Sequence, residues 1–345
     1  MNTVKENEMN INKTNETIEC VMPLIIGNEV QNTSNPEILT KGITGQEEAC
    51  KKLAFYVRSN TLETPFPTLL FTGSQGLGKS FLANKTALAL NRRFVEVNCG
   101  SSSIQKADNF IEEVLIGRVL GDTPVTLFLD EAHKLSSEVT TLLLTLLNPN
   151  SNYKNRITNK HYILEYDFSK INVILATTDA YTLFKPLRNR CEQIYFHCYS
   201  DKELFDIVKF YLKDIRVDRT NWVEIARACR GRARDAFLLA ENIKRLCNVS
   251  KVNRLTTKEW LELKDIFGIN SQGLNDQEVD LLRILADNSP MSCHNIAVRM
   301  GVNEKNIEED IEIRLKEVGY IRNTTKGRIL TTDGSKYLEK IKQVA

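Results

Sequence analysis

The sequence contains the stretch Gly73-Ser74-Gln75-Gly76-Leu77-Gly78-Lys79-Ser80, which matches the pattern G-x-x-x-x-G-K-[ST]. An apolar run over residues 68–72 predicts a strand before it, and residues 79–90 predict a helix after it. In this setting the glycines let backbone N–H groups turn inward around a phosphate, and the positive end of the helix adds to the attraction. We therefore expect a nucleotide site formed by Gly73, Gln75, Gly76, Leu77, Gly78, Lys79, Ser80 and Phe81.

A second motif supplies acidic groups. The apolar residues 126–129 predict a buried strand, and Asp130-Glu131-Ala132-His133 follows at its end. We expect Asp130 to hold the Mg²⁺ shell together with the Ser80 hydroxyl, and Glu131 to polarise an attacking water. His133 is expected to have a packing or signalling role and not a catalytic one. The two motifs together predict hydrolysis of ATP, with Mg²⁺ as the cofactor.

Strands and helices alternate through this part of the chain. Further strands are predicted over residues 93–98, 125–130 and 171–178, with a helix over residues 135–147. Such alternation predicts an α/β fold in which a mostly parallel sheet is covered on both faces. An extended stretch with a polar tip between residues 150 and 168 predicts a β-hairpin.

The rest of the chain divides into two smaller modules. The first contains amphipathic helical runs over residues 201–213, 221–230 and 233–247. The second contains three predicted helices, over residues 276–287, 292–300 and 304–318, then two short strands and a last helix, which is the winged helix-turn-helix pattern. We therefore expect a disordered leader (1–35), a large ATPase domain (36–199), a small helical lid domain (200–270) and a C-terminal winged helix (271–345).

Composition places few limits on function. The formal net charge is only +2, so any contact with nucleic acid must come from local basic patches. The eight cysteines include no C-x-x-C pair, which disfavours zinc, and a chain of 345 residues needs no disulfide framework. We expect reduced thiols in the cytoplasm. The longest apolar run near the N-terminus, residues 21–26, is too short to span a bilayer.

Several residues after the two motifs resemble those of the AAA+ family. Thr178 ends the strand over residues 171–178, as the sensor 1 residue of that family does. Arg190 resembles the arginine finger, which acts in a neighbouring subunit, with Arg188 as the alternative; Arg234 resembles the sensor 2 residue that faces the γ-phosphate. Ile43 matches the position that packs on adenine. An arginine finger acting in a neighbour implies that the active form is an oligomer.

Within AAA+ proteins, the chain most resembles the RuvB family over roughly residues 36–340. The resemblance rests on Gly76-Leu77-Gly78-Lys79, on Gly273-Leu274-Asn275 and on the wing-like residues 320–328. It implies a homo-oligomeric ring, expected to be a hexamer. Such a ring uses ATP to pump the duplex arms of a four-way (Holliday) junction in recombination and repair, with the winged helix facing DNA.

The charges of the last module favour a DNA contact through the wing. Residues 303–318, which include the helix that ordinarily enters a major groove, carry six acidic and three basic residues. Residues 320–342 carry six basic and two acidic residues. We therefore expect sequence-independent contacts to phosphates from Arg322, Lys326 and Arg328.

Other readings remain open at this point. In the RuvB family the partner protein RuvA docks on an apolar hairpin, but residues 152–160 are polar and basic, which disfavours a RuvA-like partner and makes this tip a rival DNA contact. The residues Asn189-Arg190-Cys191 resemble the corresponding segment of clamp-loading ATPases, which favours a clamp- or helicase-loading ATPase. A nucleotide-switched DNA-binding regulator is the third reading, and the presence of Glu131, Arg190 and Arg234 argues against it.

Overall fold

The computed structural model describes residues 34–61, 64–121, 123–147, 154–158, 163–167, 170–270 and 273–344. The leader expected over residues 1–35 lies outside these residues, apart from Ser34 and Asn35. The seven cysteines within the described residues are all free thiols. Among the helices of this part of the chain, none is both long and apolar enough to cross a membrane.

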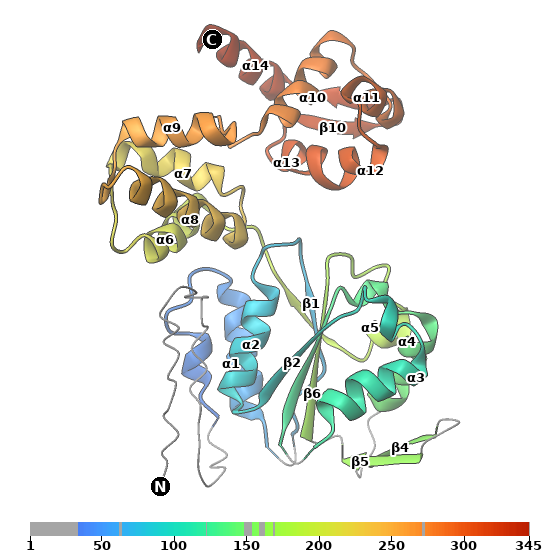
Figure 1. The fold of residues 1–345 in the computed structure, drawn as a ribbon. Helices are drawn as coiled ribbons and strands as arrows, with labels where there is room; N and C mark the ends of the chain where they lie inside the picture. The colour runs from blue at the N-terminus through green and yellow to red at the C-terminus, as the bar shows by residue number, and fades with distance from the viewer. Residues whose placement is uncertain are drawn as a thin grey trace, which may run out of the picture. The chain divides into compact units, whose positions relative to one another are not determined.

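A five-stranded parallel sheet with the order β2-β3-β6-β1-β7 forms the centre of the first domain (Figure 1). The four strands predicted before residue 180 are confirmed to within one residue at each end. Because all the strands are parallel, their carboxyl ends meet at one edge, where ligands bind in open α/β sheets. The strands are β1 (Leu69–Thr72), β2 (Arg93–Asn98), β3 (Val125–Asp130), β6 (Ile171–Thr177) and β7 (Glu192–Tyr195).

Helices cover both faces of this sheet. Successive residues of a strand point to opposite faces, so Leu127 and Leu129 of β3 join the core on one face and Phe128 joins the core on the other. In Figure 1, α1 and α2 lie on one side of the sheet and α3 and α4 on the other. The helical elements are η1 (Pro36–Leu39), α1 (Glu47–Ser59), α2 (Lys79–Ala89), η2 (Ser102–Ile104), α3 (Ala107–Asn109), η3 (Phe110–Val119), η4 (Ala132–Lys134), α4 (Ser137–Leu146) and α5 (Lys185–Arg188).

Several elements of this domain were not predicted from the sequence, and η3 and β7 are the largest helix and the one sheet strand among them. The π-helix η3 contains Gly117, which weakens the helical signal of its otherwise apolar residues. Strand β7 has only four residues and pairs with β1, far away in the chain. The predicted hairpin is confirmed as β4 (Lys154–Thr158) and β5 (Ile163–Asp167), which pair antiparallel. Of the polar residues 152–160, residues 154–158 form β4, and residues 152, 153, 159 and 160 lie outside the described residues.

The lid domain contains four helices around its own apolar core, which includes the fully buried Trp260. Two of its helices begin with a capping box, in which Ser200 pairs with Glu203 and Thr256 with Glu259. The elements are α6 (Asp201–Tyr211), β8 (Arg216–Val217), η6 (Arg219–Asn221), α7 (Trp222–Ala228), α8 (Ala233–Val249), β9 (Arg254–Leu255) and α9 (Thr257–Phe267).

The last module has the predicted order of three helical segments, two strands and a final helix. Gly327 opens the second strand of the wing with a φ of +124°, and a Cβ at this position would lie 2.3 Å from the carbonyl oxygen of Met291. Only glycine fits this close approach. The elements are α10 (Asp276–Asp287), α11 (Cys293–Met300), α12 (Glu304–Asn306), η7 (Ile307–Ile311), α13 (Glu312–Glu317), β10 (Ile321–Thr324), β11 (Gly327–Leu330) and α14 (Thr332–Val344).

Candidate nucleotide-binding site

The glycine loop lies between β1 and the first residue of α2, at the carboxyl edge of the sheet. Gly76 and Gly78 have φ angles of +78° and +91°, which favour glycine. A Cβ on Gly76 would lie 3.2 Å from the Cβ of Arg234, so the loop packs closely against the start of α8. The backbone N–H of Arg234 also donates to the Gly76 carbonyl, with a distance of 3.2 Å. The lid domain therefore contacts the phosphate loop directly.

Lys79 is a buried cation at the base of this loop. Its ammonium donates to the carbonyl oxygens of Gly73 (2.7 Å) and Ser74 (2.8 Å). Burial lowers the pKa of Lys79, while the nearby carboxylates of Asp130 and Glu131 act in the opposite direction. A cation held here stabilises phosphate oxygens bound at the loop.

Asp130 and Glu131 follow β3 as adjacent carboxylates with different surroundings. Burial raises the pKa of Asp130, and a hydrogen bond from the backbone N–H of Glu131 (3.0 Å) partly offsets this rise. Glu131 has a left-handed φ of 55°, so the chain turns sharply after the strand. Its carboxylate lies 3.3 Å from Nε2 of His133 and 3.6 Å from Nζ of Lys134.

A cavity of about 790 Å³ brings most of the expected nucleotide residues together. Its lining combines the polar loop and carboxylates with an apolar end formed by Tyr199, Ile207, Phe210, Tyr211 and Phe237. A polar end for phosphates and an aromatic end for a base suit a nucleotide. The expected residues that line it are Ile43, Gln75, Gly76, Gly78, Lys79, Ser80, Phe81, Asp130, Glu131 and Arg234.

Tyr199 is a residue of this site that was not predicted. Its hydroxyl donates to the carbonyl oxygen of Leu77 (3.0 Å), and burial raises its pKa to about 12. Its ring lies so close to Gly45 that a Cβ there would be 2.6 Å from a ring carbon. Tyr199 thus joins the phosphate loop to the segment that carries Ile43. No local sequence pattern predicts this contact, because Tyr199 and Leu77 are 122 residues apart in the chain.

The donor set fits Mg²⁺. Ser80 and Asp130 line the same cavity and offer a hydroxyl and a carboxylate oxygen. Among the described residues, no group of three or more His, Cys, Asp or Glu side chains is arranged to hold a metal ion. Mg²⁺ commonly takes one or two protein ligands and completes its shell with phosphates and water. These two residues are therefore sufficient as protein ligands.

Four of the expected residues lie outside the cavity lining: Gly73, Leu77, Thr178 and Arg190. Thr178 is exposed just beyond β6, whereas its neighbour Thr177 is fully buried. Arg188 donates to the carbonyl oxygen of Ala180 (3.1 Å) and stacks on the Tyr181 ring, so it is engaged within its own chain. Arg190 is exposed and makes only a 3.5 Å contact to the Pro186 carbonyl oxygen. Of the two arginines, Arg190 is the better placed to reach a second subunit.

The three basic wing residues differ in their surroundings. Arg322 and Lys326 are exposed. Arg328, which was expected to contact phosphates, instead donates to Glu312 (2.9 Å) and Glu308 (2.8 Å) of the preceding helical segments. Its side chain is only 14% exposed. Arg328 therefore fastens the wing to the helix.

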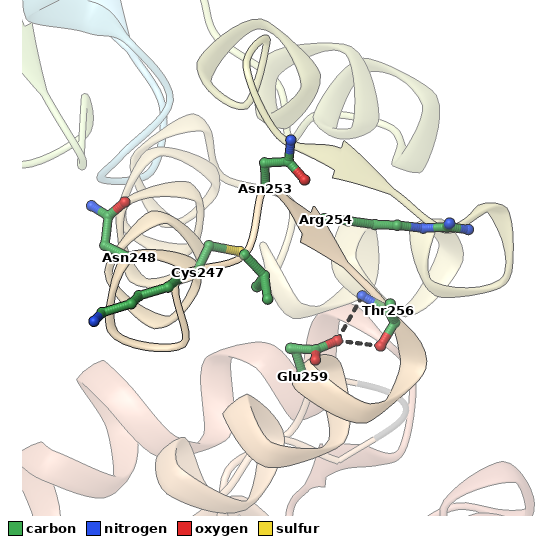
Figure 2. Close-up of a pocket in the computed structure, with 8 residues that line it drawn as sticks. Cys247, Asn248, Asn253, Arg254, Thr256 and Glu259 are labelled. Atoms are coloured by element: carbon green, nitrogen blue, oxygen red, sulfur yellow. Dashed lines mark hydrogen bonds between the residues drawn. The ribbon is translucent and has the colours of Figure 1, made fainter.

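A second hollow, of about 640 Å³, lies in the lid domain between the end of α8 and the start of α9 (Figure 2). Three of its polar residues, Arg254, Thr256 and Glu259, are engaged in the fold. Figure 2 shows Glu259 bonded to Thr256, which is the cap of α9, and Arg254 is held by Asp218 at 2.9 Å. This hollow contains none of the phosphate-binding residues.

Comparisons with known families match two parts of the chain. The model of the ATPase family associated with various cellular activities (AAA) matches residues 69–199. The model of the RuvB C-terminal winged helix domain matches residues 271–339. These two matches and the observed sheet confirm the predicted α/β ATPase domain and winged helix.

Relatives of known name are similar over most of their length. The Holliday junction branch migration complex subunit RuvB of Thermotoga maritima is 26% identical over 86% of this chain and 89% of its own. The same subunit of Campylobacter jejuni subsp. doylei is 29% identical over 84% of this chain and 87% of its own. The solved structure of the Thermotoga maritima RuvB Holliday junction branch migration motor superposes with a TM-score of 0.70 at 25% identity, covering 86% of this chain and 95% of that chain. A point mutant of that protein gives a TM-score of 0.72 at 25% identity over 89% of this chain and 98% of that one.

Proposed function

We propose that this chain, which belongs to the RuvB family of AAA+ ATPases, is an ATP-driven motor that moves the duplex arms of four-way DNA junctions. One observation carries the proposal: a single chain combines a RuvB-type winged helix with a cavity that holds a phosphate loop and two carboxylates. A clamp- or helicase-loading ATPase accounts for the cavity but not for this winged helix.

The residues of the cavity divide the chemistry of ATP hydrolysis among them. The backbone N–H groups of the loop and the Lys79 ammonium bind phosphate oxygens. Ser80 and Asp130 would hold Mg²⁺, which would neutralise charge on the phosphates. Glu131 polarises the attacking water, and Arg234 stabilises the charge that develops on the γ-phosphate. Ile43 and Tyr199 face the base.

Two further residues act at the same site from outside the cavity. Thr178 follows β6 next to the carboxyl ends of β1 and β3, where its hydroxyl can orient the water. Arg190 supplies its cation to the site of a neighbouring subunit, as arginine fingers do. This arrangement needs a ring of subunits, which we propose to be a hexamer in the cytoplasm.

The wing holds DNA through phosphates. Arg322 and Lys326 are exposed cations on a module whose adjacent helical segments are acidic. Such contacts position a protein on a duplex without reading its sequence. Because Arg328 is engaged by two carboxylates, we propose that it orients the wing and does not itself contact phosphates. The rival contact is the hairpin tip over residues 152–160, of which residues 154–158 are described. Its polar and basic character disfavours a RuvA-like partner.

Salt titration of DNA binding tests this function. Replacing Arg322 or Lys326 with Ala should weaken binding equally for unrelated sequences and should make the slope of log affinity against log salt shallower by roughly 0.9 per lost contact. Basal ATP hydrolysis should persist, because the wing is separate from Lys79 and Glu131, while stimulation by four-way junction DNA should fall. An unchanged slope in both variants would contradict a wing-led contact.

A further inference from the structure

Three side chains form a continuous series of contacts beside the nucleotide cavity. His133 Nε2 lies 3.3 Å from Oε2 of Glu131, and His133 Nδ1 lies 3.0 Å from the hydroxyl oxygen of Thr177. The two neighbours belong to different strands, since Glu131 follows β3 and Thr177 ends β6. His133 therefore bridges the carboxyl ends of two adjacent strands of the sheet.

The bridge is well enclosed. Thr177 is fully buried, and the side chains of His133 and Glu131 are 20% and 16% exposed. Lys134 also approaches Glu131, but its side chain is 52% exposed, and an exposed lysine fixes a carboxylate weakly. Of these two basic neighbours, His133 is the less exposed and lies closer to the Glu131 carboxylate.

The donors and acceptors around Thr177 bear on which nitrogen of the His133 ring carries a hydrogen. The Thr177 oxygen accepts from the backbone N–H of Asp179 (3.1 Å) and has one hydrogen to donate, either to the Asp179 carbonyl (3.0 Å) or to His133. When Thr177 donates to Nδ1, the neutral ring carries its hydrogen on Nε2, facing the carboxylate. That hydrogen then lies beside the Glu131 carboxylate, whose Oε2 is 3.3 Å from Nε2 and only accepts. The ring form with its hydrogen on Nε2 therefore requires the Thr177 hydrogen to point to Nδ1 and not to the Asp179 carbonyl oxygen.

We propose that His133 is a positioning residue that holds the Glu131 carboxylate and ties it, through Thr177, to the segment that carries Thr178. The two groups assigned to the attacking water are then placed by one connected structure. His133 is not among the residues that line the cavity, so it acts on Glu131 and not on the nucleotide. This inference rests on the role of Glu131 in the proposed function.

The effect of losing His133 or the Thr177 hydroxyl on kcat and KM distinguishes a positioning role from a role in nucleotide binding. Loss of the bridge should lower kcat for ATP hydrolysis, because a misplaced catalytic group costs up to about 100-fold. It should leave KM and the affinity for a fluorescent ATP analogue near the wild-type values, since Lys79 and the loop are untouched. A defect that merely loosened the fold would instead change binding and turnover together.

The experiment uses full-length wild type, Thr177→Val, Thr177→Ser, His133→Phe and the Val/Phe double variant. Turnover is expressed per nucleotide-binding site, so that unfolded protein does not count as lost activity. Val removes the hydroxyl, whereas Ser keeps it; we therefore expect Thr177→Val to lose at least about tenfold in kcat and Thr177→Ser to retain most of it. His133→Phe should match Thr177→Val, and the double variant should lose no more than either single variant.

Equal kcat in Thr177→Val and Thr177→Ser would overturn the proposal, and so would independent losses that multiply in the double variant. If His133→Phe does not fold, the Val and Ser variants still decide the question. Glu131→Gln is measured in parallel: if it turned over at the wild-type rate, the assignment of Glu131 would fail, whereas normal turnover in Thr177→Val with an inactive Glu131→Gln would refute only the bridge.

Discussion

Glu131 is the residue on which the proposed chemistry most depends. It lies at the cavity wall near His133 and Lys134, and its charge is assigned to polarise a water because Asp130, the other carboxylate of the cavity, is assigned to Mg²⁺. Gln keeps its size but removes that charge. We expect Glu131→Gln to lose about 100-fold or more in kcat while still binding ATP, so that the ATP-bound state accumulates.

Lys79→Ala provides the contrast for Glu131→Gln. It removes a cation from the phosphate loop, so it should weaken nucleotide binding as well as turnover. Equilibrium binding of a fluorescent ATP analogue and steady-state hydrolysis distinguish the two variants. Near-normal turnover in Glu131→Gln would remove the catalytic assignment.

At the scale of elements, the sequence predicted what local patterns encode. The apolar run of β3 ends at two carboxylates, and the glycine loop joins a strand to a helix. The sequence alone therefore predicted that both motifs lie at the edge of the sheet. Strand β7 has only four residues and no such signature, and its pairing with β1 depends on tertiary structure. Helix α1 begins at Glu47, directly after Gln46, which has a left-handed φ of 55°.

For the candidate site too, the sequence predicted the residues of local motifs but not those brought in by tertiary structure. Most of the motif residues expected at the site line the cavity, but Gly73 and Leu77 do not, whereas Tyr199 reaches it from a distant segment. Arg328 shows a second limit. The sequence predicted that Arg328 is an exposed cation of the wing. In the structure Arg328 pairs with acidic residues of the helix, which a count of charges along the sequence does not reveal.

The link between wing and helix leads to a stability prediction. Arg328→Ala would leave Glu312, which is 1% exposed, with Lys316 as its remaining basic partner. We expect a loss of about 1–3 kcal/mol in the stability of the winged helix, whereas Arg322→Ala should be close to neutral. Thermal unfolding of the full chain, monitored through a probe in this domain, checks both; equal effects would contradict the assigned roles.

The same link should make winged-helix stability depend on pH. Burial alone would raise the pKa of Glu312, but hydrogen bonds from Arg328 and Lys316 outweigh this, and its pKa lies below the ordinary value. A lowered folded pKa contributes stability above the unfolded value of about 4.3, and that contribution is lost as pH falls through the folded value. Arg328→Ala should lose much of this acid dependence.

On the scale of the whole assembly, Arg190 is proposed to complete a neighbour's site. Arg190→Ala should then keep its ATP affinity and lose about 1000-fold in kcat. Mixing it with Lys79→Ala creates some interfaces that pair an intact Lys79 site with an intact Arg190. Activity should therefore reappear in the mixture. Its absence at every ratio, when both variants still assemble, would count against action between subunits.

The most direct test of the motor is ATP-dependent dissociation of a synthetic four-way junction with homologous arms, measured with and without RuvA. The account predicts that the wild-type chain separates the junction into duplex products when ATP and Mg²⁺ are present, and that Glu131→Gln binds the junction without separating it. ATP hydrolysis by the wild-type chain with the junction left intact under both conditions would contradict the central claim.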